Sequence, residues 1–245
     1  MLKPVRKHSV SDAVFEQLRD QIVSGELTPG SPLPAERVLC EALAVNRGSV
    51  REALRRLEQS RLVSVRHGGT SQVLDYRASA GLDLLADLII SPSGQFDPRV
   101  VGAIIEMRSA LAPDIARRAA ERGGADDAEA LAAVTARMTA RAGDLAALQD
   151  LAVEFWSQLV DAADNLAYRL AYNSMRATYD QCRELLTQVL AEELGDVERY
   201  RAIAAAVQAH DAERAAQLGR ELVERGEHAV KHALAQLAPL QEAAR

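Results

Sequence analysis

Arginines at helical spacing give one short segment of this chain the chemistry to bind nucleic-acid bases. Residues 47–57 read Arg-Gly-Ser-Val-Arg-Glu-Ala-Leu-Arg-Arg-Leu. On a helix with about 100° per residue, one face carries Arg47, Gly48, Arg51 and Arg55. Arginine can hold a guanine edge through two hydrogen bonds, and glycine or serine lets the backbone approach closely. This face therefore predicts contact with the major groove of DNA.

The opposite face of the same helix is apolar and predicts burial in a protein core. It consists of Val50, Ala53, Leu54 and Leu57. An ordinary amphipathic helix with a solvated basic face would show the same pattern, and Glu52 could neutralise Arg55 or Arg56 within the helix. The helix alone does not separate these two interpretations, so the flanking segments must decide.

The flanking segments complete a winged helix-turn-helix. We expect a preceding helix to begin at Pro34, with Leu39 and Leu43 on its apolar face, and Asn46 to be the N-cap of the next helix. In residues 61–74, apolar and polar side chains alternate up to a Gly-rich stretch, and a second β-prone stretch follows it, which predicts a hairpin. His67 and Gly68 at its tip could contact a phosphate or the minor groove, although His67 could also be a plain turn residue.

These segments resemble the GntR family of bacterial transcription regulators, and within it the FadR subgroup. The resemblance is carried by residues 15–18, 22–25, 27–30, 33–37 and 45–54, including Leu-Pro-Ala-Glu-Arg and Val-Asn-Arg-Gly-Ser-Val-Arg-Glu-Ala-Leu. It implies DNA-contacting positions at Arg37, Asn46, Arg47, Ser49, Arg51, His67 and Gly68. The chain departs from the family at Asn46, where Ser or Thr is more common, and at Gly48, where others have a larger side chain.

The charge of the chain is unevenly distributed. The 245 residues carry a net charge of -6, which by itself argues against binding nucleic acid. Residues 1–75 contain 11 Lys and Arg against 9 Asp and Glu, a balance of +2, and the remainder contains 18 against 26, a balance of -8. Cys40 and Cys182 form no disulfide or zinc pattern, and no long apolar segment or signal peptide is recognisable. We expect a cytoplasmic bacterial protein without a membrane partner.

The rest of the chain predicts a mainly α fold, in which an antiparallel all-α bundle follows the winged domain. We place the DNA-binding domain at residues 1–75, a linker and the start of the first bundle helix at 76–82, and an effector-binding and dimerisation domain at 83–245. Helices are expected near residues 80–90, 97–122, 125–142, 145–164, 166–193, 196–208 and 211–237. Small-molecule sites in such bundles form between helices.

The family resemblance also concerns a metal. Many relatives bind one through an aspartate and three histidines, and aligned residues place these positions on Ala152, Trp156, Tyr200 and Leu222. None of these is an ordinary zinc ligand, so we expect no metal and no other cofactor. The remaining histidines near the C-terminus, His210, His228 and His232, are expected at the surface.

Aromatic residues in place of metal ligands predict an apolar effector site. Trp156, Tyr200 and Leu222 would line it, and Tyr172 and Tyr179 could share the same space. Arg108 matches a FadR effector-site position and could pair with an acidic group of a ligand. The resemblance implies long-chain acyl-CoA as the effector. The plainer alternatives are that the tyrosines are core residues and that Arg108 is a buried ion-pair partner of an acidic neighbour.

No nucleophile, phosphate loop or paired-carboxylate motif indicates an enzyme. We therefore expect a homodimeric transcription regulator that binds a double-stranded DNA operator and responds to a small-molecule or lipid effector. Two alternatives stay open. The effector could be a small organic acid held by Arg108, or the chain could be a DNA-binding dimer that responds to no ligand.

Overall fold

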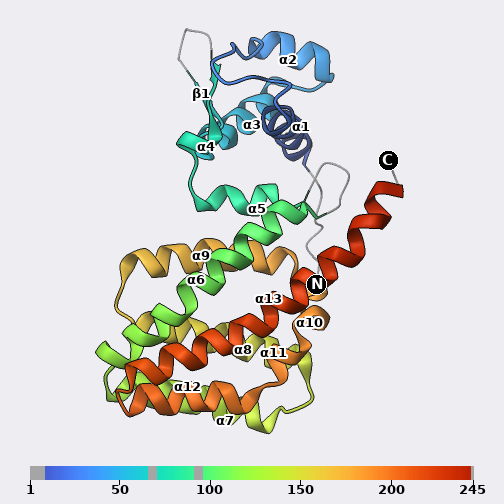
Figure 1. The fold of residues 1–245 in the computed structure, drawn as a ribbon. Helices are drawn as coiled ribbons and strands as arrows, with labels where there is room; N and C mark the ends of the chain where they lie inside the picture. The colour runs from blue at the N-terminus through green and yellow to red at the C-terminus, as the bar shows by residue number, and fades with distance from the viewer. Residues whose placement is uncertain (1–8, 66–70, 91–95, 244–245) are drawn as a thin grey trace, which may run out of the picture. The chain divides into compact units, whose positions relative to one another are not determined.

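The computed structural model describes residues 9–65, 71–90 and 96–243, and its contacts divide the chain into two compact units. Unit 1 extends from Met1 to Phe96 and unit 2 from Asp97 to Arg245. Within the described residues, regular structure is helical apart from one two-stranded sheet (Figure 1). The predicted fold class, a winged helix-turn-helix followed by a helical domain, is confirmed.

Three helices and a β hairpin form the core of unit 1. Their bounds are α1 Val10–Ser24, α2 Glu36–Leu43, α3 Arg47–Gln59, β1 Val63–Ser64 and β2 Gln72–Val73. The strands are antiparallel, with Val63 opposite Val73. Phe15 of α1 and Leu57 of α3 are almost fully buried together with Val63. Burial of one apolar face on each helix therefore holds α3 against α1 and the hairpin.

The helix before α3 begins later than the sequence predicts. We expected its start at Pro34, but α2 begins at Glu36, after Ala35 in an extended conformation. The N–H of Leu33 donates to the carbonyl oxygen of Ser71 at 2.8 Å, which ties this segment to the hairpin. Leu33 is thus paired with the hairpin and Ala35 has a ψ of 148°, so the helix begins after Pro34.

The segment after the hairpin belongs to unit 1 over a longer stretch than expected. It forms α4 Tyr76–Ser79, a 3₁₀ turn η1 Leu82–Leu84 and a single helical turn α5 Leu85–Leu88. Leu84 is buried in the core of unit 1, and Leu88 packs against that core. The contacts consequently group residues up to Phe96 with unit 1, whereas the sequence predicts that the second domain begins at residue 83.

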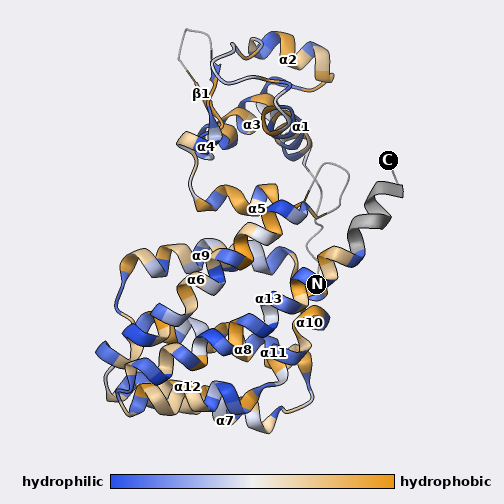
Figure 2. Cartoon of the chain, viewed as in Figure 1, coloured by the Kyte–Doolittle hydropathy of each residue, from blue (hydrophilic) through white to orange (hydrophobic). Residues whose placement is uncertain are grey.

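Unit 2 consists of helices. Their bounds are α6 Pro98–Arg122, α7 Ala125–Ala140, α8 Leu145–Ala162, α9 Leu166–Gln181, α10 Arg183–Val189, α11 Ala191–Gly195, α12 Val197–Gln208 and α13 Ala212–Ala243. Hydrophobic and hydrophilic residues alternate along them, as expected for amphipathic helices packed in a bundle (Figure 2). The two longest, α6 and α13, pack along each other, and Gly219 permits their approach because a Cβ there would lie 3.2 Å from the Cβ of Ala116.

The prediction of one continuous helix over residues 166–193 is wrong, because the structure divides this segment into α9, α10 and α11. The helix is interrupted at Cys182 and again at Leu190, where the backbone dihedral angles leave the helical range. At the first break, the buried Gln149 of α8 donates from Nε2 to the carbonyl oxygen of Arg183 at 2.9 Å. This contact from a distant helix is a tertiary effect, which local periodicity does not contain.

Candidate DNA interface and effector site

The two faces of α3 are confirmed. The exposed residues are Arg47, Gly48, Arg51 and Arg55. The buried residues are Val50, Ala53, Leu54 and Leu57. The N-terminal half of α3 thus presents guanidinium groups to solvent, which is where a recognition helix contacts base edges.

Two arginines that the family resemblance implies at DNA-contacting positions are bonded to carboxylates of α2. The Nε of Arg51 donates to Oε2 of Glu36 at 2.9 Å, and Nη1 of Arg37 donates to Oε1 of Glu41 at 2.7 Å. The Arg51 and Glu36 side chains are 61 % and 39 % exposed, so this pair contributes at most about 1 kcal/mol to stability. Since Arg51 uses only Nε for Glu36, its two terminal nitrogens remain available for a guanine edge.

The basic charge of α3 is not neutralised within the helix. Among the described residues, Glu52 pairs with neither Arg55 nor Arg56. Arg56 instead donates to Asp12 of α1, which makes it a structural residue of unit 1. Arg47 and Arg55 form no ion pair with any residue that the structure describes. These two side chains therefore retain charge that a DNA phosphate or base can use.

Asn46 is the N-cap of α3, as the sequence predicts. Its Oδ1 accepts a hydrogen bond from the Ser49 N–H at 2.9 Å, and Ala44 turns the chain with a positive φ of 53°. A Cβ at Gly48 would lie 3.1 Å from the same Oδ1. Glycine at this position therefore leaves the capping amide uncrowded, which gives Gly48 a local role besides close approach to DNA.

The wing is confirmed as a hairpin through the pairing of β1 with β2. Its tip, residues 66–70, lies outside the described residues. The DNA-contacting roles expected for His67 and Gly68 stay predictions.

In unit 2, Arg108 of α6 and Glu193 of α11 form an ion pair inside the domain. Nη1 of Arg108 donates to one carboxylate oxygen at 3.0 Å, and Nη2 donates to the other. The Glu193 side chain is 3 % exposed and that of Arg108 is 23 % exposed. Burial by itself lowers the pKa of Arg108, but attraction and hydrogen bonding to Glu193 raise it above its ordinary value. Arg108 therefore stays charged and has Glu193 as its counterion.

Trp156 and Tyr200 lie beside this pair with polar atoms that lack good hydrogen bonds. Both residues are buried, and the Phe155 ring meets each of them edge to face, with centroids 6.2 Å and 5.0 Å away. Burial raises the pKa of Tyr200 well above its ordinary value, and the Glu193 charge adds to the effect. The Trp156 Nε1 and the Tyr200 hydroxyl are neighbours, but neither forms a well-aligned hydrogen bond with a described residue. Leu222 is fully buried in the same core.

Tyr172 and Tyr179 of α9 are half-buried, and each hydroxyl has a partner. The Tyr172 hydroxyl donates to the carbonyl oxygen of Val153 at 2.7 Å, and the Tyr179 hydroxyl accepts from Gln149 at 2.7 Å. Burial raises the pKa of Tyr172 to about 12. Both rings pack against the core that contains Trp156 and Tyr200.

Sequence reasoning did not identify Glu193, although it allowed an acidic partner for Arg108. The two residues are 85 positions apart, and Glu193 follows another glutamate on a segment that looks like ordinary helix surface. The sequence feature that could have pointed to this contact is Gly226, a glycine inside a helix. A Cβ at this helical glycine would lie 1.9 Å from Oε2 of Glu193, so glycine there makes room for the carboxylate.

Comparison with known proteins identifies the family. Residues 10–73 match the model described as bacterial regulatory proteins, gntR family, and residues 103–225 match the FCD domain. The chain belongs to the GntR family. It is 38 % identical over 223 residues to the HTH-type transcriptional regulator Mce2R of Mycobacterium tuberculosis, covering 91 % of this chain and 92 % of that one. The fatty acid metabolism regulator protein of Edwardsiella ictaluri is 30 % identical over 175 residues, 71 % of each chain.

A solved structure supports the fold. That of Lar, a protein described as controlling the expression of the Listeria monocytogenes agr system, matches with a TM-score of 0.56 and 18 % identity, covering 93 % of this chain and 99 % of that one. As a GntR regulator with an FCD domain, the chain is a DNA-binding transcription regulator and not an enzyme. The narrower FadR assignment stays a prediction.

The described part of this GntR chain holds no group of three His, Cys, Asp or Glu side chains that could bind a metal ion. His210, His228 and His232 are exposed, as predicted, and Nδ1 of His210 lies 2.9 Å from the carbonyl oxygen of Ala120. No helix in the described ranges is both long and apolar enough to cross a bilayer.

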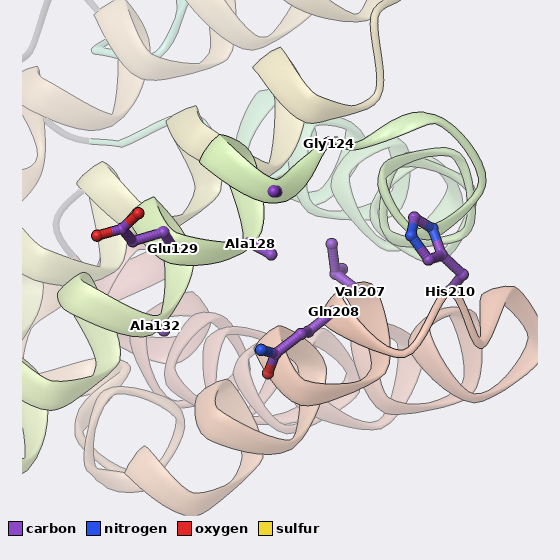
Figure 3. A pocket seen from close by; sticks show the side chains of 8 residues that line it. Gly124, Ala128, Glu129, Ala132, Val207, Gln208 and His210 are labelled. Carbon is purple, nitrogen blue, oxygen red and sulfur yellow. The ribbon is translucent and has the colours of Figure 1, made fainter.

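A hollow of about 400 Å³ opens at the surface of unit 2, between α7 and the end of α12. Figure 3 shows Ala128, Val207 and Gln208 around it, with Glu129 and His210 at its sides. Its lining contains neither lysine nor arginine. Since it lacks a permanent positive charge to offset that of an acidic ligand, it is a weaker candidate for such a ligand than the surroundings of Arg108.

Proposed function

We propose that this GntR regulator acts as a homodimer on a two-fold symmetric operator, and that an acidic effector bound at Arg108 controls its affinity for DNA. A two-fold protein matches a palindromic site, with one winged domain on each half. Effector binding would shift the population between two arrangements of the dimer, with a coupling of about 1–3 kcal/mol.

The observation that carries this proposal is the chemistry around Arg108. A partly buried guanidinium is a strong partner for a carboxylate, and the unpaired polar atoms of Trp156 and Tyr200 could bond to the oxygens of a ligand. Such a set of donors fits a small organic acid. Tyr172, Tyr179 and Leu222 complete the proposed surroundings of the ligand.

Long-chain acyl-CoA is the second candidate effector. Relatives named fatty acid metabolism regulator protein, from Edwardsiella ictaluri and Serratia proteamaculans, are 30 % and 28 % identical to this chain. Their names support the FadR assignment and the predicted lipid effector. The rings of Phe155, Trp156 and Tyr200 would contact an acyl chain. The charges of Arg108 and Glu193 would disfavour it, because an apolar chain beside them would replace polar surroundings and raise the free energy of the complex.

Isothermal titration calorimetry on the full chain separates these effectors. Lactate, succinate and citrate are titrated against oleoyl-CoA, at constant ionic strength and with sodium chloride as the control. The proposal expects saturable binding of at least one small acid and its loss in the double variant Arg108→Gln with Glu193→Gln, which leaves no unpaired buried charge. Binding of oleoyl-CoA alone favours the second candidate. Binding of none, with unchanged affinity for DNA, favours a regulator that responds to no ligand.

A further inference from the structure

The carboxylate of Glu193 occupies the position where the proposed function requires the effector's acid group. It engages both terminal nitrogens of Arg108, as a bidentate ligand carboxylate would, and its side chain is almost entirely buried. Arg108 has no other hydrogen-bond partner among the described residues, although its side chain is 23 % exposed. The chain therefore supplies its own occupant for the anion position.

We propose that Glu193 is a built-in competitor of the effector, which an acidic ligand must displace from Arg108 before it can bind. This inference rests on the proposed function, because it assumes that the ligand uses Arg108. It adds that Glu193 occupies the anion position at Arg108 in the ligand-free protein, and that the ligand binds there only when Glu193 leaves.

The surroundings of Glu193 explain how its release would reach the rest of unit 2. It lies on α11, a helix of five residues joined at Leu190 and Asp196 by residues outside the helical conformation. The next residue, Leu194, is 1 % exposed and anchors α11 in the core. A displaced Glu193 charge cannot stay unpaired in that core, so α11 must move to bring the carboxylate to water.

Gly226 tests whether Glu193 and the effector's acid group share one position. A Cβ at this position would lie 1.9 Å from Oε2 of Glu193 and 3.1 Å from Nη1 of Arg108. The end of a flexible glutamate yields more easily than the backbone of α13. The change Gly226→Ala therefore displaces the Glu193 carboxylate, and its methyl group denies the same position to the acid group of a ligand.

The test measures the dissociation constants of lactate, succinate and citrate for the full chain and four variants. Glu193→Gln removes the charge of the competitor, and Gly226→Ala fills the shared position with a methyl group. The double variant Arg108→Gln with Glu193→Gln removes the site. Gly102→Ala is the matched control, because it also adds a methyl group to a helical glycine but meets nothing within 4 Å. Circular dichroism and thermal unfolding verify that each variant is folded.

The inference expects Glu193→Gln to bind a small acid at least tenfold more tightly than the wild type, and Gly226→Ala to bind it at least tenfold more weakly. Gly102→Ala should match the wild type, and the double variant should not bind. If the wild type binds an acid through Arg108 but Glu193→Gln binds it no more tightly, or Gly226→Ala binds it equally well, the competitor role is overturned and the proposed function stands. If neither the wild type nor Glu193→Gln binds any of the three acids, both are overturned.

Discussion

The DNA interface is tested most sharply by Arg51→Ala. Loss of a bidentate guanine contact costs about 1–3 kcal/mol, or about 5-fold to 150-fold in Kd for the specific site. Because Arg51 is exposed, the free energy of unfolding should change by at most about 1 kcal/mol, the upper bound for its pair with Glu36. The change also leaves the carboxylate of Glu36 without its partner near DNA phosphates. The double variant Arg51→Ala with Glu36→Gln should therefore bind about 0.2–1 kcal/mol more tightly than Arg51→Ala alone.

Fluorescence anisotropy on two duplexes provides the measurement for Arg51. One duplex is selected from a random library by the wild type, and the other has the same composition in scrambled order. Both are titrated at several concentrations of sodium chloride. The matched control is Arg201→Ala in unit 2, an exposed arginine whose Nη1 lies 2.8 Å from Oε1 of Glu198, and it should leave both affinities unchanged.

A base contact and a phosphate contact give different results in this assay. If Arg51 contacts a base, the loss is confined to the selected duplex and the salt dependence is preserved. Equal losses on both duplexes, with a salt slope smaller by about 0.9, would make Arg51 a phosphate contact and refute our interpretation of its role.

Four further predictions concern stability. Asn46→Ala removes the cap of α3 and should cost about 0.5–2 kcal/mol in the free energy of unfolding measured with urea, whereas no loss would contradict the capping role. Leu57→Ala should cost about 2–5 kcal/mol in the same assay, since Leu57 is fully buried, and a cost below 1 kcal/mol would mean that the core is loosely packed. Gly219→Val should cost about 1–3 kcal/mol by forcing α13 away from α6, and an unchanged midpoint would refute the close approach. A hydrogen bond from the Tyr168 hydroxyl lowers the pKa of the Asp114 carboxyl. The stabilisation that this carboxylate gives the folded state is present above the ordinary pKa of 3.8 and is lost as pH falls through the lowered pKa. The difference in free energy of unfolding between the wild type and Asp114→Asn should therefore shrink over that acidic range, and a pH-independent difference would be contrary evidence.

The parts of the molecule that the sequence predicts well are those controlled by local periodicity and capping. The two faces of α3 follow from residues three and four apart, and the cap at Asn46 follows from a short polar side chain before a helix. The hairpin follows from alternation around a Gly-rich turn. In each case, residues close in the chain contain the physical cause.

The parts that the sequence did not predict depend on contacts between distant residues. Gln149 of α8 bonds at the break between α9 and α10, 34 positions away, and Leu33 bonds to Ser71 across the start of the hairpin. Arg108 was singled out, but its partner Glu193 was not, because only the folded bundle brings them together. The same limit applies to Arg51 and Glu36, whose pairing requires the turn between α2 and α3.

The central claim is that an acidic ligand at Arg108 controls DNA binding through α3. The most direct measurement is the operator Kd of the full chain, by anisotropy, with and without saturating lactate, succinate or citrate. The account predicts that at least one acid changes this Kd by about 5-fold to 150-fold in the wild type and has no effect in the double variant Arg108→Gln with Glu193→Gln. An equal change in the double variant, or no change with any of the acids, would contradict it.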